Sequence, residues 1–351
     1  MAQLFLSRWT RRAEAPLLLE SFFVASAASF LGIRWFLAAT GYPRIGSNGI
    51  HIAHMLWGGL LMLLALMCLF VFLDSSARHL AAVIAGLGFG TFIDEIGKFV
   101  TADNDYFYRP AIALIYGVFV ALFLLGRVLV AQQRPLRRRE ALANALDLLA
   151  DHPDGPVDPE VHAAIKRLLE VADPDVPMTR FAREYLAQLP EAKPKKGFGS
   201  RLYRRLADGY ERVMANEWAE SAVIVGVVTY TAILVAAAVL RVWMSYGSGG
   251  QALASAIIAQ LVSTTVGAAC IAAGVIRLTR SRMAAYDWFT RGVLVWILVT
   301  QVFVFYSSQL EGLGGLVVDL VAYAGLRFAM TREVVAGREG SWVSGRPGQA
   351  A

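Results

Sequence analysis

The sequence has little charge for its length. Only 17% of its 351 residues are charged and 57% are hydrophobic, whereas a soluble domain has about 25% charged residues. This balance excludes an ordinary soluble globular protein. It also excludes a disordered chain, because disorder requires low hydrophobicity. The class that remains is a polytopic membrane protein.

Cysteine and the common catalytic motifs are also scarce. The two cysteines, Cys68 and Cys270, lie inside apolar runs, which argues against a disulfide framework or a thiolate metal site. The sequence has no Walker A motif for ATP, no Gly-x-Ser-x-Gly nucleophile motif and no zinc-finger or RNP pattern. The net charge of +6 is therefore interpreted as the basic excess of loops on one side of a membrane, and no nucleic-acid partner is expected.

Apolar runs long enough to cross a bilayer dominate what is present. A helix needs about 20 such residues to span the hydrocarbon core. Eight runs are predicted to be spans: seven meet this need, and the last is shorter and is expected to be tilted or re-entrant. They cover residues 17–40, 50–73, 80–100, 110–131, 219–242, 252–276, 288–310 and 313–328. The predicted fold is an all-α polytopic membrane protein of about eight transmembrane helices, arranged as four plus four.

Arginine and lysine set the expected orientation. They gather in the arm at residues 1–16, in the connection at 132–216 and in the tail at 329–351. The positive-inside rule then places both termini in the cytoplasm of a cell whose inner membrane holds the protein. The two membrane halves are residues 17–131 and 217–328, and the tail is expected to be disordered.

The connection at residues 132–216 is polar but has apolar residues at helical spacing, interrupted by proline, aspartate and glycine. This pattern predicts three or four short helices on the cytoplasmic face. Such an insertion is also a candidate surface for a cytoplasmic protein partner.

Ionisable residues inside the apolar runs are the main functional signal, because each costs on the order of 3 kcal/mol to insert and therefore marks a candidate site. With a rise of 1.5 Å per residue, four of them lie roughly 6–9 Å inside the outer surface, and these are Arg34, His54, Asp94 and Glu95. The set, with one arginine from the following loop, is Arg34, His51, His54, Asp94, Glu95, Lys98 and Arg109.

The residue types favour a metal-assisted membrane enzyme, such as a hydrolase, acting on a lipid or lipid-linked substrate. His51, His54 and Glu95 would bind a divalent metal (Zn, Fe or Mn) that activates a water molecule. Asp94, oriented by Lys98, would act as the base or support the ligands. The substrate's anionic headgroup would be bound by two arginines, Arg34 and Arg109.

Two other interpretations use the same residues. The first is a proton- or cation-coupled transporter for a small molecule, in which these groups relay protons. The second is a structural or sensory module, in which Asp94 pairs with Lys98 and Glu95 pairs with Arg34. Asp319, alone in the last span, also needs a partner. The sequence leaves the choice between these interpretations open.

Overall fold

The structure is a computed structural model of the chain. It describes residues 9–41, 53–102, 108, 110–130, 136–152, 155–190, 217–245 and 251–343. Within these ranges every regular element is a helix. Seven of the described helices are long and apolar enough to cross a membrane, so the all-α class is confirmed and the helix lengths agree with a multi-pass membrane protein.

The count of eight spans stays a prediction. The seventh membrane-spanning candidate, Arg282–Met330, has 49 residues. It contains a 3₁₀ turn at Gln309–Gly312 that separates two helical stretches. This candidate therefore has room for the last two predicted spans.

The chain divides into two compact units, and each is described by itself. Unit 1 contains Met1–Tyr106 and Val118–Lys196, and unit 2 contains Phe107–Gly117 and Gly197–Ala351. The boundary between the units falls inside one helix, α6 (Ala111–Val130).

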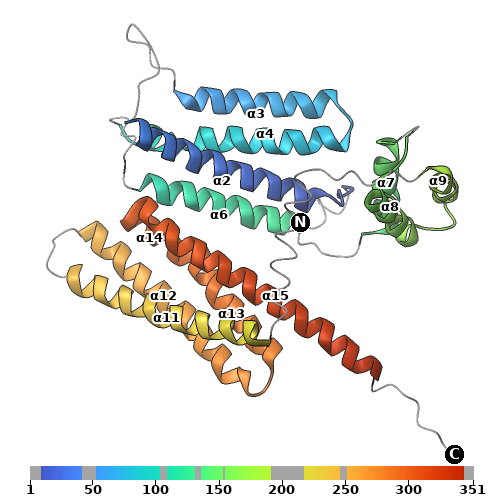
Figure 1. Cartoon of the computed structure of the whole chain (residues 1–351). Coiled ribbons are helices and arrows are strands. Elements are labelled where there is room, and N and C mark those ends of the chain that lie inside the picture. Colours follow the sequence, from blue (N-terminus) through green and yellow to red (C-terminus); the bar gives the residue numbers. More distant parts are fainter. Residues whose placement is uncertain are drawn as a thin grey trace, which may run out of the picture. The chain divides into compact units, whose positions relative to one another are not determined.

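Unit 1 is built around α4. Its helices before the polar connection are α2 (Ala15–Thr40), α3 (His54–Val71), α4 (Ser75–Ile93), α5 (Ile96–Val100) and the later part of α6. Helix α4 packs along both α2 and α3 (Figure 1). The predicted third span, residues 80–100, is therefore two helices, because the chain turns at Asp94 and Glu95.

Glycines let α4 approach both neighbours closely. A Cβ on Gly86 would lie 2.4 Å from the Phe22 carbonyl oxygen, and one on Gly90 would lie 2.2 Å from the Ser26 carbonyl oxygen, both on α2. On the α3 side, a Cβ on Gly88 would lie 2.7 Å from the Gly58 carbonyl oxygen. Small residues are used this way where membrane helices pack backbone to backbone.

The polar connection forms three described helices. They are α7 (Arg138–Ala150), α8 (Pro159–Val171) and α9 (Pro177–Gln188). Their shared core consists of Ala145, Leu149, Val157, Ile165, Leu169, Ala182 and Leu186. We call these three helices the α7–α9 insertion. Its cytoplasmic location stays a prediction.

Ion pairs and hydrogen bonds join the α7–α9 insertion to the rest of unit 1. Arg11 Nη2 lies 3.0 Å from Glu140 Oε2, and this hydrogen bond lowers the pKa of the Glu140 carboxyl. The buried guanidinium of Arg78, near the start of α4, donates to Asp147 at 2.7 Å and to Glu14 at 2.7 Å. The Ser75 amide donates to the Asp151 carboxylate at 3.2 Å. The first turn of α4 is thus fixed to α7.

Unit 2 is a bundle of long helices. They are α11 (Glu217–Ser245), α12 (Gln251–Leu278), α13 (Arg282–Val295), α14 (Gln301–Ser308) and α15 (Leu313–Val343). A π-helical turn, Trp296–Thr300, joins α13 to α14. Helix α15 runs past residue 329, where the predicted tail begins, because the alanine, methionine, arginine and glutamate that follow are good helix formers.

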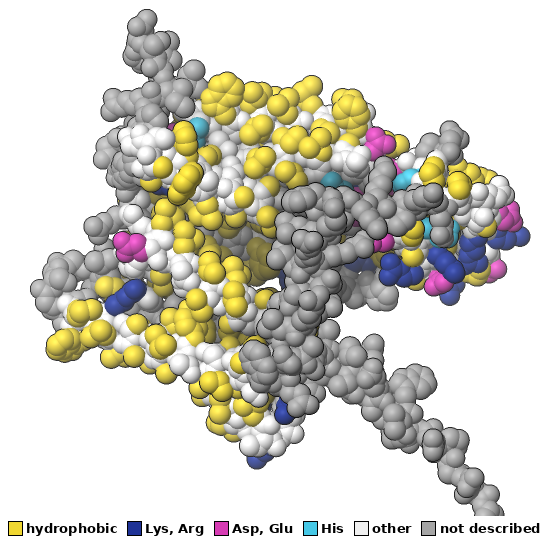
Figure 2. Space-filling view, in the orientation of Figure 1, with side chains coloured by type: hydrophobic (Ala, Val, Ile, Leu, Met, Phe, Trp, Pro, Cys, Tyr) yellow, Lys and Arg dark blue, Asp and Glu magenta, His cyan; other side chains and the backbone are white. Residues whose placement is uncertain are grey.

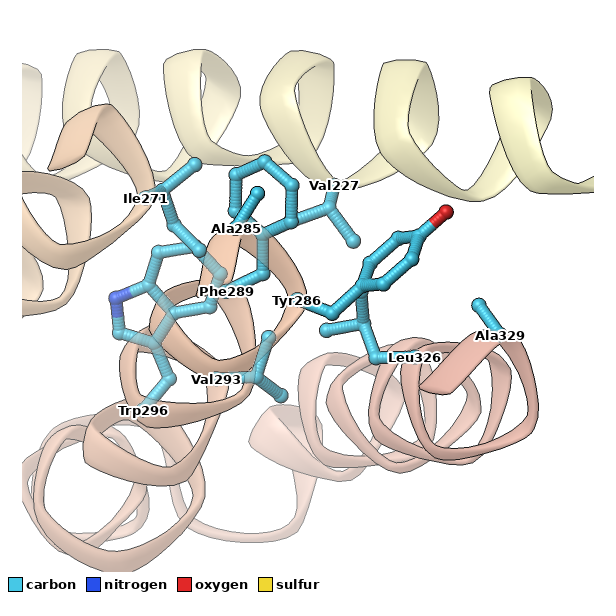
Figure 3. Close-up of a cluster of buried hydrophobic side chains, with 9 residues drawn as sticks. All are labelled: Val227, Ile271, Ala285, Tyr286, Phe289, Val293, Trp296, Leu326 and Ala329. Carbon is cyan, nitrogen blue, oxygen red and sulfur yellow. The ribbon is translucent and has the colours of Figure 1, made fainter. Parts of the chain in front are cut away.

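Aromatic residues fill the core of unit 2. Tyr286, Phe289 and Trp296 are fully buried between α11, α12 and α15 (Figure 3). A Cβ on Gly267 would lie 2.1 Å from Trp296 Nε1, so a glycine in α12 makes room for the indole ring.

The surface agrees with a membrane location. Figure 2 shows hydrophobic side chains spread over the long helices, whereas acidic and basic side chains gather over α7–α9. On α3, Trp57 is 54% exposed and Phe70 is 83% exposed. Extended apolar surface of this kind is rare in soluble monomers and is normal where helices contact lipid.

Candidate functional site

Three pieces of backbone bring the candidate site together in unit 1. Arg34 lies near the end of α2, and His54 is the first residue of α3. Asp94 and Glu95 occupy the turn between α4 and α5, and Lys98 lies in α5. We call Arg34, His54, Asp94, Glu95 and Lys98 the His54 cluster.

The turn after α4 explains how two consecutive carboxylates enter one cluster. In a continuous helix, adjacent side chains diverge by about 100°, so the sequence predicts that Asp94 and Glu95 face the interior only obliquely. The helix instead ends at Ile93 and restarts at Ile96. Both acidic side chains are fully buried, with 0% exposure.

His54 lies between the two carboxylates. Its Nε2 is 2.9 Å from Asp94 Oδ2, and its Nδ1 is 3.4 Å from Glu95 Oε1. The two ring nitrogens therefore contact different acids on opposite edges of the imidazole. The His54 side chain is 23% exposed, so it reaches from the buried acids toward the surface of unit 1.

Each buried carboxylate also has its own cation. Arg34 Nε pairs with Asp94 Oδ1, and Arg34 Nη2 donates to the Asp94 carbonyl oxygen at 3.0 Å. Lys98 Nζ lies 2.6 Å from Glu95 Oε1. Burying a carboxylate without a partner is very costly, so these pairs are what keeps both acids inside the unit.

The start of α3 adds a further contact to Glu95. The Met55 amide donates to Glu95 Oε2 at 3.0 Å. A helix N-terminus carries unpaired N–H groups and a partial positive charge, both of which favour a carboxylate there. Sequence reasoning missed this contact, because a backbone donor leaves no side-chain signal.

The structure thus brings together five of the seven predicted residues, but their ion pairs differ from the predicted ones. The ion-pair interpretation joins Asp94 to Lys98 and Glu95 to Arg34, whereas Arg34 pairs with Asp94 and Lys98 pairs with Glu95. The turn at residues 94–95 causes the difference, since i and i+4 share a face only in an unbroken helix. His51 and Arg109 lie outside the described residues.

One polar contact continues from the cluster along the interface of α2 and α4. The hydroxyls of Ser29 and Thr91 lie 2.9 Å apart, about one turn from Asp94. Ser26, a further turn along α2, is fully buried and donates to the Phe22 carbonyl. Small polar residues spaced one turn apart are the sequence signal that could have located these contacts between α2 and α4.

Metal binding is not supported by a described ligand set. Among the residues that the structure describes, no group of three or more His, Cys, Asp or Glu side chains is placed to hold a metal ion. Within the His54 cluster the reason is the position of the imidazole, because its two nitrogens contact different acids. The predicted set includes His51, which is outside the described residues, so the metal stays a prediction.

Comparisons of the chain with protein-family models, with curated proteins and with solved structures found no match.

Proposed function

We propose that the protein is a proton-coupled membrane transporter in which His54 exchanges the coupling proton. The observation that supports this proposal is the place of the imidazole between two fully buried carboxylates, at 2.9 Å and 3.4 Å. Histidine is the side chain whose charge changes most readily near neutral pH.

The hydrogen-bonding capacity of imidazole makes the site sensitive to one proton. Both ring nitrogens donate only in the imidazolium form, and the neutral ring has one donor and one acceptor. A neutral His54 therefore satisfies only one of its two carboxylate neighbours with an N–H. Release of a proton from the imidazolium therefore leaves either Asp94 or Glu95 facing a ring nitrogen that carries no hydrogen.

The charges of the cluster also favour a single exchangeable proton. The two carboxylates are balanced by Arg34 and Lys98, so the cluster has no net charge with neutral His54 and one positive charge with imidazolium. Among the three groups that contact the buried acids through their side chains, Arg34 is always charged. His54 is the group suited to exchange a proton at neutral pH.

Proton exchange at this place has a structural consequence that transport requires. His54 opens α3, whereas Asp94 and Glu95 follow α4. When the imidazolium loses its proton, its attraction to the two carboxylates weakens, and α3 is held less tightly to the end of α4. The predicted topology places this end in the outer leaflet, and the Ser29–Thr91 contact extends polar groups away from it along α4.

The test is proton movement in proteoliposomes that contain a pH-sensitive dye. The purified protein is exposed to an imposed pH gradient, and Na⁺, K⁺, amino-acid, sugar and organic-acid pools are added in turn. We expect at least one pool to cause an internal pH change that is abolished in His54→Gln. His162→Gln, on α8, is the matched control and should behave as the wild type.

Two results would overturn the proposal. One is a correctly folded His54→Gln protein that moves protons as the wild type does, since the cluster would then be structural. The other is near-stoichiometric metal in protein purified without chelators that disappears in His51→Ala/His54→Ala. That second result would favour the metal-assisted enzyme acting on a lipid or lipid-linked substrate.

A further inference from the structure

Asp319 is a buried acid in unit 2 that the His54 cluster does not involve. It lies on α15 and is 3% exposed. Its Oδ1 has no hydrogen-bond partner among the described residues. An ionised carboxylate in that state would lack compensation for the water it has lost.

The groups around Asp319 are polar but not basic. Tyr230, from α11, interacts with its carboxyl, and Tyr116, from the part of α6 that belongs to unit 2, is a second titratable group near it. No described basic side chain pairs with Asp319. The environment therefore suits a neutral acid rather than a carboxylate held by a cation.

The Tyr230 hydroxyl contacts a backbone acceptor close to Asp319. It lies 3.4 Å from the Gly315 carbonyl oxygen, one turn before Asp319 on α15. A phenol has a single O–H and can both donate and accept. It can therefore donate to the Gly315 carbonyl while accepting from a protonated Asp319, or turn and donate to an ionised Asp319.

The backbone beside this pair is irregular. The π-helical turn Trp296–Thr300 precedes Gln301, whose buried side chain donates to the Gly312 carbonyl at 2.7 Å. The Tyr116 hydroxyl donates to the Ile297 carbonyl within that turn. Such π-turns occur often at functional sites, and in transporters interrupted helices accompany buried ion and proton sites.

We propose that Asp319 is the acid of a second, buried proton-binding site, with Tyr230 as its hydrogen-bond partner. When the proton is bound, the Asp319 O–H donates to Tyr230, which donates to the Gly315 carbonyl. When the Asp319 O–H bond breaks, the proton leaves to water and the Tyr230 hydroxyl turns to the carboxylate. This inference does not rest on the function proposed for unit 1.

The experiment is pH-difference infrared spectroscopy of the full-length protein in lipid nanodiscs. We expect a carboxylic C=O band that disappears as the pH rises and that shifts in protein made with isotope-labelled aspartate. Asp319→Asn should remove the band. Glu311→Gln, an exposed acid in the turn before α15, is the control and should keep it.

A further variant tests the role of Tyr230 without removing the acid. Tyr230→Phe should keep the band but move its frequency, because the C=O stretch responds to hydrogen bonding. The proposal is wrong if folded Asp319→Asn gives the same difference spectrum as the wild type. It is also wrong if no aspartate band is present at any pH, or if Tyr230→Phe leaves the band where it is.

Discussion

At the scale of single residues, the His54 cluster holds two carboxylates that are fully buried, and each has one cation of its own. Arg34 is 8% exposed, whereas Lys98 is 24% exposed. Removing one member of a buried ion pair costs more than removing both, because the remaining charge stays buried without compensation. The two pairs therefore differ in what they contribute to stability.

Arg34→Met should lower the free energy of unfolding by about 3–5 kcal/mol, because it leaves Asp94 without its guanidinium. Lys98→Met should cost less, since Lys98 is more exposed. Equilibrium unfolding in mixed micelles measures both changes.

The matched control is the double variant Arg34→Met/Asp94→Leu, which removes both charges. We expect it to recover most of the stability that Arg34→Met loses. A double variant as unstable as the single one would show that the pair does not account for the loss.

Residue identities at this site were predictable from sequence, but the contacts were not. Charged residues at one depth in three apolar runs identified Arg34, His54, Asp94, Glu95 and Lys98. Their pairing depends on the turn at residues 94–95, and no proline or breaking motif in Phe-Ile-Asp-Glu-Ile-Gly marks it. The turn follows from tertiary packing, which local pattern cannot supply.

At the scale of helices, the close approach of α4 to α2 depends on Gly90. Gly90→Ala should destabilise the protein by about 1–3 kcal/mol, because the added Cβ meets backbone that must shift. That Cβ would lie 2.2 Å from the Ser26 carbonyl oxygen. Thermal unfolding in detergent measures the effect.

The control for this change is Gly32→Ala on α2, where a Cβ meets nothing within 4 Å. It should leave stability unchanged or raise it slightly. Equal losses from the two substitutions would contradict close packing at Gly90.

The contact between the N-terminal arm and α7 should depend on pH through Glu140. Arg11 lowers the pKa of this carboxyl in the folded state, so its contribution is present above the ordinary glutamate pKa of about 4.3. The contribution disappears as the pH falls through the lower folded pKa. Glu140→Gln should therefore have a lower melting temperature than the wild type at neutral pH but not in strong acid.

Glu160→Gln, an exposed residue of α8, provides the comparison and should match the wild type at every pH. A difference between wild type and Glu140→Gln that grows in acid would contradict a lowered pKa of the Glu140 carboxyl in the folded protein.

At the scale of the whole molecule, hydropathy predicted the helices well because membrane helices must satisfy their own backbone. Helix α11 runs from Glu217 to Ser245, against the predicted residues 219–242. The π-turn at Trp296–Thr300 and the helical continuation of α15 to Val343 were not foreseen. Neither the π-turn nor the extension of α15 changes the spacing of apolar residues, which is the signal that the sequence prediction used.

The predicted orientation can be tested with single cysteines in a background lacking Cys68 and Cys270. A cysteine at Ser47, in the predicted outer connection, should react with an impermeant maleimide added to intact cells. One at Ala163, on α8, should react only after the cells are opened. The reverse pattern would invert the topology and would place the His54 cluster near the cytoplasm.

The glycines of α4 have one further consequence. Gly86 and Gly90 contact α2, whereas Gly88, about 200° around the axis from Gly86, contacts α3. Rotation of α4 about its own axis would bring side chains against the backbone of α2 and of α3 at once. The packing therefore fixes the rotational position of α4. Any displacement of α4 that starts at the turn at Asp94 is therefore a shift along the helix axis or a tilt. Such a motion reaches Arg78 and Ser75 at the other end of α4, whereas a rotation about the axis does not.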